Sequence, residues 1–130
     1  MRLRPDLGET HLALAEYYSS SAFSPAGGTS GGVQSGSFDR AREELAIARL
    51  KLPNNARPIF LTAWLDRRQN RWDSALANFQ KAHELDPRDS AHASYLGITY
   101  FELRRYKELE QFMKNVLTTA YLRVRGHSFG

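Results

Sequence analysis

Phe60, Trp64 and Arg67 are the residues whose types and spacing best suit binding of another molecule. They lie at i, i+4 and i+7, so on a helix they would share one face. The stretch AWLDRRQNRW adds Arg68 and Arg71 beside them. Trp and Arg dominate the hot spots of protein interfaces. Such a face favours an extended or helical peptide that carries an apolar anchor and an acidic group.

A structural interpretation of the same stretch stays open beside the functional one. Trp64 would then pack against a neighbouring helix, and the arginines would pair in solvent with Asp66 and Asp73. Both interpretations place the same residues on one helix.

Residue patterns for catalysis or metal binding are missing from the sequence. Without Cys the chain has no thiolate zinc site, no Cys nucleophile and no disulfide. None of the four His residues forms an HExxH pair, and there is no Gly-x-Ser-x-Gly elbow. His83 and His92 flank Pro87 and are expected at the surface. We therefore expect a non-enzymatic protein with no catalytic residue, no metal site and no cofactor.

A Gly- and Ser-rich stretch, SSSAFSPAGGTSGGVQSGS, covers residues 19–37. Gly27 and Gly32 have the outer spacing of a phosphate-binding P-loop. Val33 and Gln34 stand where that loop needs Lys and Ser or Thr, and no strand pattern precedes it. We therefore expect no nucleotide here. The composition instead predicts a flexible loop, because it buries too little apolar surface to order itself.

Length, composition and charge are typical of one globular domain. The chain has 130 residues, of which 42% are hydrophobic and 25% charged. No apolar run reaches the roughly 18 residues of a membrane span, and no signal peptide is recognisable. The net charge is +4, but acidic and basic residues alternate in DRAREEL and ELRRYKELE. We expect salt-bridged helix surfaces, no membrane or nucleic-acid partner, and a cytoplasmic location.

A spacing of 34 residues relates two parts of the chain, as Pro53 and Pro87 illustrate. Residues at matching positions before the two prolines agree in type: Phe38 with Trp72, Ala41 with Ala75, Leu45 with Phe79 and Ala48 with Ala82. At matching positions after Pro5, Pro53 and Pro87 stand Leu14, Ala15 and Tyr18, then Thr62, Ala63 and Asp66, then Leu96, Gly97 and Tyr100. A fixed period of this length indicates a repeated structural unit.

The residue pattern of each unit predicts a pair of antiparallel helices. Apolar residues spaced three and four apart make one face of a helix. The small residues Ala15, Ala63 and Gly97 would let a partner helix approach closely. Phe38 and Trp72 are expected to begin the second helices of their pairs, and the Pro of ELDP is expected to end one pair before the next.

The motifs YLGITY, ALANF and ELDP resemble the tetratricopeptide repeat family, whose pattern is Leu-Gly-x-x-Tyr, then Ala-x-x-x-Phe, then Pro. The resemblance covers nearly the whole chain. It implies an all-α fold, a right-handed α-solenoid of three stacked helix hairpins. The first unit is longer than the period, and the excess falls between its two helices.

The resemblance also implies the organisation of the chain as a single domain of residues 1–130. The repeat units would be residues 6–55, with a Gly/Ser-rich insertion at 21–36, then 56–89 and 90–118, followed by a tail of residues 119–130. The insertion is expected to be a mobile loop at the tip of the first hairpin.

In this family the first helix of each pair lines a concave groove. The resemblance therefore implies a peptide-binding set of Leu12, Glu16, Ser19, Arg57, Phe60, Trp64, Arg67, Arg68, Ser94, Ile98, Phe101 and Glu102. Some members hold a peptide's terminal carboxylate with a Lys/Asn clamp in this groove. Leu12 and Glu16 stand where that clamp would begin, which argues against this type of recognition.

The resemblance implies a non-enzymatic scaffold or regulatory module that binds a protein or peptide on its concave face. Self-association as a homo-oligomer is the alternative, because a short array exposes apolar end surfaces. The third unit carries Leu109, Met113 and Val116 where its sisters have different residues, and could pack on another copy. A third interpretation, nucleic-acid binding with steep salt dependence, would use Arg67, Arg68, Arg71, Arg104 and Arg105.

Overall fold

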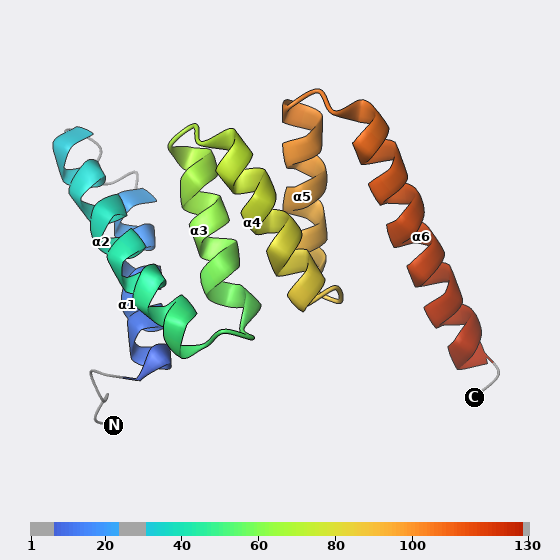
Figure 1. The fold of residues 1–130 in the computed structure, drawn as a ribbon, viewed down its shortest axis with the longest axis horizontal. Coiled ribbons are helices and arrows are strands. Elements are labelled where there is room, and N and C mark those ends of the chain that lie inside the picture. Colours follow the sequence, from blue (N-terminus) through green and yellow to red (C-terminus); the bar gives the residue numbers. More distant parts are fainter. Residues whose placement is uncertain (1–6, 24–30, 129–130) are drawn as a thin grey trace.

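The computed structural model describes residues 7–23 and 31–128, which form six α-helices and no strand (Figure 1). The helices are α1 (Gly8–Phe23), α2 (Gly31–Lys51), α3 (Ala56–Arg68), α4 (Trp72–Leu85), α5 (Ser90–Glu102) and α6 (Tyr106–Ser128). The prediction of an all-α fold is therefore confirmed for these residues. None of these six helices has the length and hydropathy of a membrane span.

The helices follow one another in a row, with α1 and α2 at one end and α6 at the other (Figure 1). Each helix packs against the next one in sequence, and α1 also contacts α3. Short turns at residues 69–71, 86–89 and 103–105 join the helices from α3 onwards. Packing that is mainly between sequence neighbours is compatible with a helical repeat.

The 34-residue spacing recurs in the backbone of the described chain. The N-caps of α3 and α5, Asn55 and Asp89, are one period apart, and each side chain accepts a hydrogen bond from the N–H two residues later, at 2.9 and 2.8 Å. After each helix one residue, Asn70 or Arg104, is left-handed, with φ of 63° and 58°. These two are also one period apart. The repeat therefore includes the caps and turns as well as the apolar residues.

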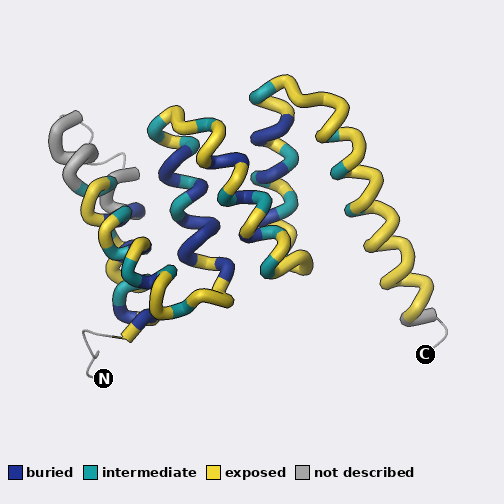
Figure 2. The backbone as a smooth tube through the Cα atoms, in the orientation of Figure 1, coloured by how far each residue is buried: buried dark blue, intermediate teal, exposed yellow. Residues whose placement is uncertain are grey.

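Small side chains fill the contacts between helices. Ala41 and Ala48 of α2 are fully buried, and so are their counterparts on α4, Ala75 and Ala82. A methyl group at these positions leaves room for two helix backbones to approach closely. Figure 2 shows buried residues along α3 and on parts of α4 and α5, whereas α6 is exposed along most of its length.

An aromatic cluster joins α3, α4 and α5. Phe79 of α4 is fully buried; its ring stacks on Tyr95 with centroids 5.6 Å apart and meets Phe60 edge-on at 5.7 Å. Phe60 also meets Tyr95 edge-on at 5.4 Å and lies 4.9 Å from the ring of His92. Such offset and edge-on pairs stabilise beyond the area that they bury, so the cluster ties the second helix pair to the third.

The predicted loop at residues 21–36 is partly helical, which corrects the sequence analysis. The helix α1 extends to Phe23, and α2 starts at Gly31. Residues 24–30 lie outside the described part of the chain. Phe38 is therefore inside α2 and does not begin it. Adding a residue to an existing helix costs far less than starting one, so helices can extend into Gly- and Ser-rich sequence.

The prediction that a tail begins at residue 119 is also wrong. The helix α6 does not end near residue 118 but continues to Ser128. By contrast, α4 begins at Trp72, as predicted, and ends at Leu85, just before the Asp-Pro of ELDP. The sequence thus predicted the boundaries of α4 well, but it placed the end of α6 too early.

Phe79→Ala should lower the free energy of unfolding by about 3–5 kcal/mol, because the change leaves a cavity among buried rings. The matched control is Phe101→Ala, which removes the same side chain from a position that is 60% exposed and should cost less than about 1 kcal/mol. Denaturant unfolding followed by circular dichroism measures both. Equal losses for the two variants would contradict the placement of Phe79 in the core.

Candidate functional site

Two ion pairs tie α3 to the first helices of the neighbouring pairs. Arg57 Nε of α3 lies 2.8 Å from Glu16 Oε1 of α1, and Arg67 Nη2 lies 2.6 Å from Glu102 Oε1 of α5. Partly exposed pairs of this kind stabilise by at most about 1 kcal/mol, but they show which sides of the three helices lie together. We call this surface the α1–α3–α5 face. It comprises Glu16, Arg57, Trp64, Arg67, Arg68, Ile98, Phe101 and Glu102.

Aromatic and aliphatic side chains form the accessible apolar part of this face. The guanidinium carbon of Arg68 lies 5.5 Å from the ring centroid of Trp64, a cation–π arrangement. Trp64 is partly buried and packs against the core. On α5, Ile98 and Phe101 are 43% and 60% exposed. The Trp64 ring thus packs against the core on one side, while Ile98 and Phe101 of α5 are exposed to solvent.

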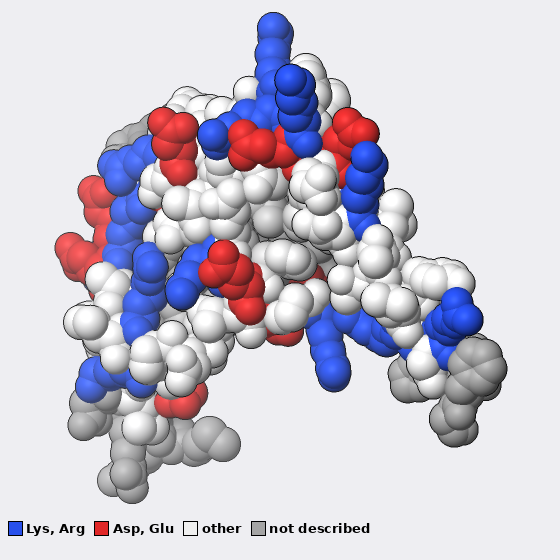
Figure 3. All heavy atoms as spheres, turned by 45° about the vertical axis from the view of Figure 1, so that its right-hand side comes forward, with Lys and Arg blue, Asp and Glu red and all other residues white. Residues whose placement is uncertain are grey.

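The charges on the surface are mixed in sign. Figure 3 shows Lys and Arg side chains next to Asp and Glu, with no broad patch of one sign in this view, and a hollow between the N-terminal helices and α6. On the α1–α3–α5 face, Arg57 and Arg67 each have a carboxylate partner. Their charge is therefore largely satisfied within the protein.

Some residues of the predicted concave set lie elsewhere. Phe60 is only 5% exposed and belongs to the aromatic cluster, so it is not part of the accessible surface. Leu12 is half-buried against the core. Ser19 is buried, and its hydroxyl donates to the carbonyl of Ala15 at 2.7 Å. Ser94 lines a cavity beside α6. The family resemblance had grouped these residues, whereas the contacts with neighbouring helices give them different environments.

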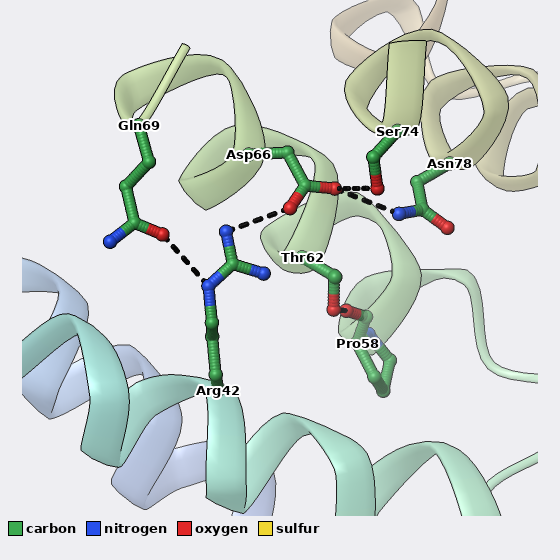
Figure 4. A network of polar contacts seen from close by, with 7 residues as sticks. All are labelled: Arg42, Pro58, Thr62, Asp66, Gln69, Ser74 and Asn78. Carbon is green, nitrogen blue, oxygen red and sulfur yellow. Dashed lines mark hydrogen bonds and ion pairs between the residues drawn. The ribbon is translucent and has the colours of Figure 1, made fainter. Parts of the chain in front are cut away.

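Asp66, two residues after Trp64, is the centre of a buried polar network (Figure 4). Its side chain is 1% exposed, and Oδ1 lies 2.7 Å from Arg42 Nη2 of α2. Oδ2 accepts hydrogen bonds from Ser74 Oγ and Asn78 Nδ2 of α4, at 2.8 and 3.0 Å. Arg42 Nε in turn donates to Gln69 Oε1 at 2.8 Å. This network overturns the interpretation in which Asp66 pairs with exposed arginines in solvent.

One sequence signal could have identified the network. Asp66 stands at the repeat position where the other two units have Tyr18 and Tyr100, and Tyr100 is buried. A carboxylate at a core position must find a cation and hydrogen-bond donors, because its desolvation is otherwise too costly. The departure from the repeat at Asp66 therefore marked a buried ion pair.

The network holds the C-terminal end of α3 in place. Asp66 connects α3 to α2 through Arg42 and to α4 through Ser74 and Asn78. Its backbone carbonyl also accepts the N–H of Arg71 at 2.8 Å, which shapes the turn into α4. Trp64 lies within one helical turn of this anchor, so its direction is fixed by the same contacts.

Two histidines, His83 and His92, lie on either side of the turn between α4 and α5. His92 is 3% exposed and His83 is half-buried, with its ring 5.3 Å from that of Phe112; neither lies free on the surface, which corrects the prediction. Burial lowers the pKa of His83, and the nearby His92 lowers it further.

Asp86, Asp89 and His92 are the only described residues that could together hold a metal ion, with ligand atoms within 4.8 Å of one another. Asp89 Oδ1, however, already caps α5. The cavity beside them is also lined by Lys51 and Arg57, whose charges oppose a cation. The arrangement is therefore that of a capped helix start.

Comparisons with known proteins add no family to these observations. Neither a scan against protein-family models nor a search of curated proteins found a match to the chain. The functional interpretation consequently rests on the geometry of the α1–α3–α5 face and on the repeat.

Asp66→Asn should lower the free energy of unfolding by about 2–4 kcal/mol, because it leaves the charge of Arg42 without its buried counter-ion. Asp73→Asn, on the exposed start of α4, is the matched control and should cost less than about 1 kcal/mol. Chemical denaturation measures both. If the two variants lose the same stability, Asp66 does not hold the helices together.

His83 should make the protein less stable in mild acid. Its pKa is lowered in the folded state, so the folded protein binds fewer protons than the unfolded chain between that pKa and the ordinary value of about 6.5. Above about pH 6.5 His83 is neutral in both states and does not destabilise the fold. As the pH falls from about 6.5 through the folded pKa, the free energy of unfolding decreases. In His83→Leu the fall in melting temperature from neutral to acidic pH should be smaller. Parallel curves for wild type and variant would contradict this.

Proposed function

We propose that the chain is a tetratricopeptide-like array whose α1–α3–α5 face binds a segment of another protein. The recurrence of caps, turns and buried alanines at one period supports the repeat. The observation that carries the binding role is the Trp64 ring, which packs against the core and lies under Arg68, together with the exposed side chains of Ile98 and Phe101 on α5. Large apolar side chains held rigidly at the surface are typical of binding hot spots.

The partner that fits this face best presents an apolar or aromatic anchor and little charge. Arg57 and Arg67 are already paired with Glu16 and Glu102. An acidic partner would compete with these carboxylates for the same arginines, so it would gain little net attraction. The sequence analysis expected a peptide with an apolar anchor and an acidic group. We now expect the apolar anchor to supply most of the affinity and the acidic group to add little.

The protein would act as a non-enzymatic scaffold or regulatory module. Its face offers stacking and apolar contact, which suit recognition. Nucleic-acid binding is less well supported, because two of the five arginines proposed for it, Arg67 and Arg105, are paired with Glu102 and Glu108 at 2.6 and 2.9 Å. Charges neutralised by a neighbouring carboxylate contribute little to phosphate binding.

Selection of a random-peptide phage library on the wild-type protein should enrich sequences with an aromatic or large aliphatic residue. Affinity of an enriched peptide, measured by fluorescence anisotropy, should fall at least about tenfold in Trp64→Ala and in Phe101→Ala, as for hot-spot residues. It should change little with salt, because charge plays a minor part.

The control variant is Leu50→Ala, which removes an apolar side chain that is 83% exposed on α2. It should bind like the wild type. Equal affinity of wild type and Trp64→Ala would rule out the α1–α3–α5 face as the binding site, and strong salt dependence would contradict the apolar anchor.

A further inference from the structure

The last helix of the row presents an apolar stripe that no described element covers. Met113, Leu117 and Tyr121 lie at i, i+4 and i+8 on α6 and are 44%, 62% and 60% exposed. Residues four apart lie one above the other on a helix, so the three side chains form a continuous line. Figure 2 shows this half of α6 exposed and leaning away from the rest of the row.

The repeat indicates what such a position normally contacts. Met113 is one period after Phe79, which is fully buried because its ring stacks on Tyr95 of α5. At Phe79, therefore, the following helix covers the surface of α4. Along α6, Leu109 and Phe112 pack against the core, whereas among the described residues no further helix covers Met113, Leu117 and Tyr121. The natural occupant of this stripe is a helix.

The charges at the two ends of the stripe favour a second copy of α6 as that helix. Glu110 lies one turn before Met113, and Arg125 lies one turn after Tyr121. In a parallel pair Glu110 would face Glu110 and Arg125 would face Arg125, whereas in an antiparallel pair opposite charges meet. We propose that the protein forms a homodimer in which α6 packs antiparallel against α6 of a second copy, centred on Leu117.

This register satisfies the apolar and the charged residues together. With Leu117 beside Leu117 of the second copy, Met113 lies beside the second copy's Tyr121. Glu110 lies opposite the second copy's Val124, one residue from its Arg125, whose long side chain can reach it. The interface is closed, because the same patch is used on both chains. Glu110 is paired with Lys114 at 3.1 Å, and Arg125 donates to the Tyr121 hydroxyl at 3.3 Å, but such exposed contacts are weak and can rearrange.

Sedimentation equilibrium of the full chain tests the dimer. At a concentration of about 0.1 mM the wild type should have an average mass close to twice the chain mass of 14.8 kDa. Leu117→Glu should be monomeric there, with a circular-dichroism spectrum like that of the wild type. The control Leu50→Glu, at another exposed leucine, should remain dimeric.

A monomeric wild type would overturn the proposal, and so would a dimer that survives Leu117→Glu. A stripe that binds only a helix of another protein would give the first of these results. The phage selection tests the α1–α3–α5 face and does not depend on these sedimentation results. A failed selection would therefore not contradict the dimer.

The absence of Cys from the chain allows the direction to be tested by cross-linking. Met113→Cys and Tyr121→Cys chains, mixed and oxidised, should form mainly the mixed disulfide dimer. Predominant homodimers of Met113→Cys would overturn the antiparallel arrangement. Glu110→Arg should weaken the dimer several-fold, and Glu110→Arg combined with Arg125→Glu should restore it, because the swapped charges attract again. No recovery in the double variant would exclude the Glu110–Arg125 contact.

Discussion

The buried carboxylate of Asp66 is the constraint on which the middle of the molecule depends. A carboxylate removed from water needs a cation and hydrogen-bond donors around it. Here Arg42 comes from α2, and Ser74 and Asn78 come from α4. Satisfying one charged group therefore fixes three helices. Apolar contacts between helices tolerate some sliding, whereas hydrogen bonds weaken steeply with distance and angle, so this network sets their register.

The arrangement of the α1–α3–α5 face depends on the same turn of α3. With Asp66 facing inwards, Arg67 and Arg68 lie further round the helix, where one meets Glu102 of α5 and the other lies over Trp64. The ion pairs neutralise most of the positive charge on the face. What remains accessible is mainly apolar, which is why the proposed partner is recognised by an anchor side chain.

The α6 end of the row differs from its middle because each helix is covered mainly by its neighbours in sequence. Phe79 is buried by the helix that follows it, but Met113, in the same place one period later, is half exposed. The bulkier residues that the sequence analysis singled out on α6 thus have two roles. Leu109 packs inwards on α5, and Met113 forms part of the exposed stripe.

The sequence by itself predicted an all-α chain, the short helices of the repeat and the small residues between them. Spacing within one helix and the identity of Pro, Asn and Asp at helix ends are local properties, so the 34-residue pattern predicted α3, α4 and α5 closely. Only the tertiary structure decided that Asp66 and His92 are buried, that Phe60 belongs to the core and that Phe101 remains outside. Whether a side chain is buried, and which charge it meets, depends on residues of other helices, and no spacing within one helix specifies those partners.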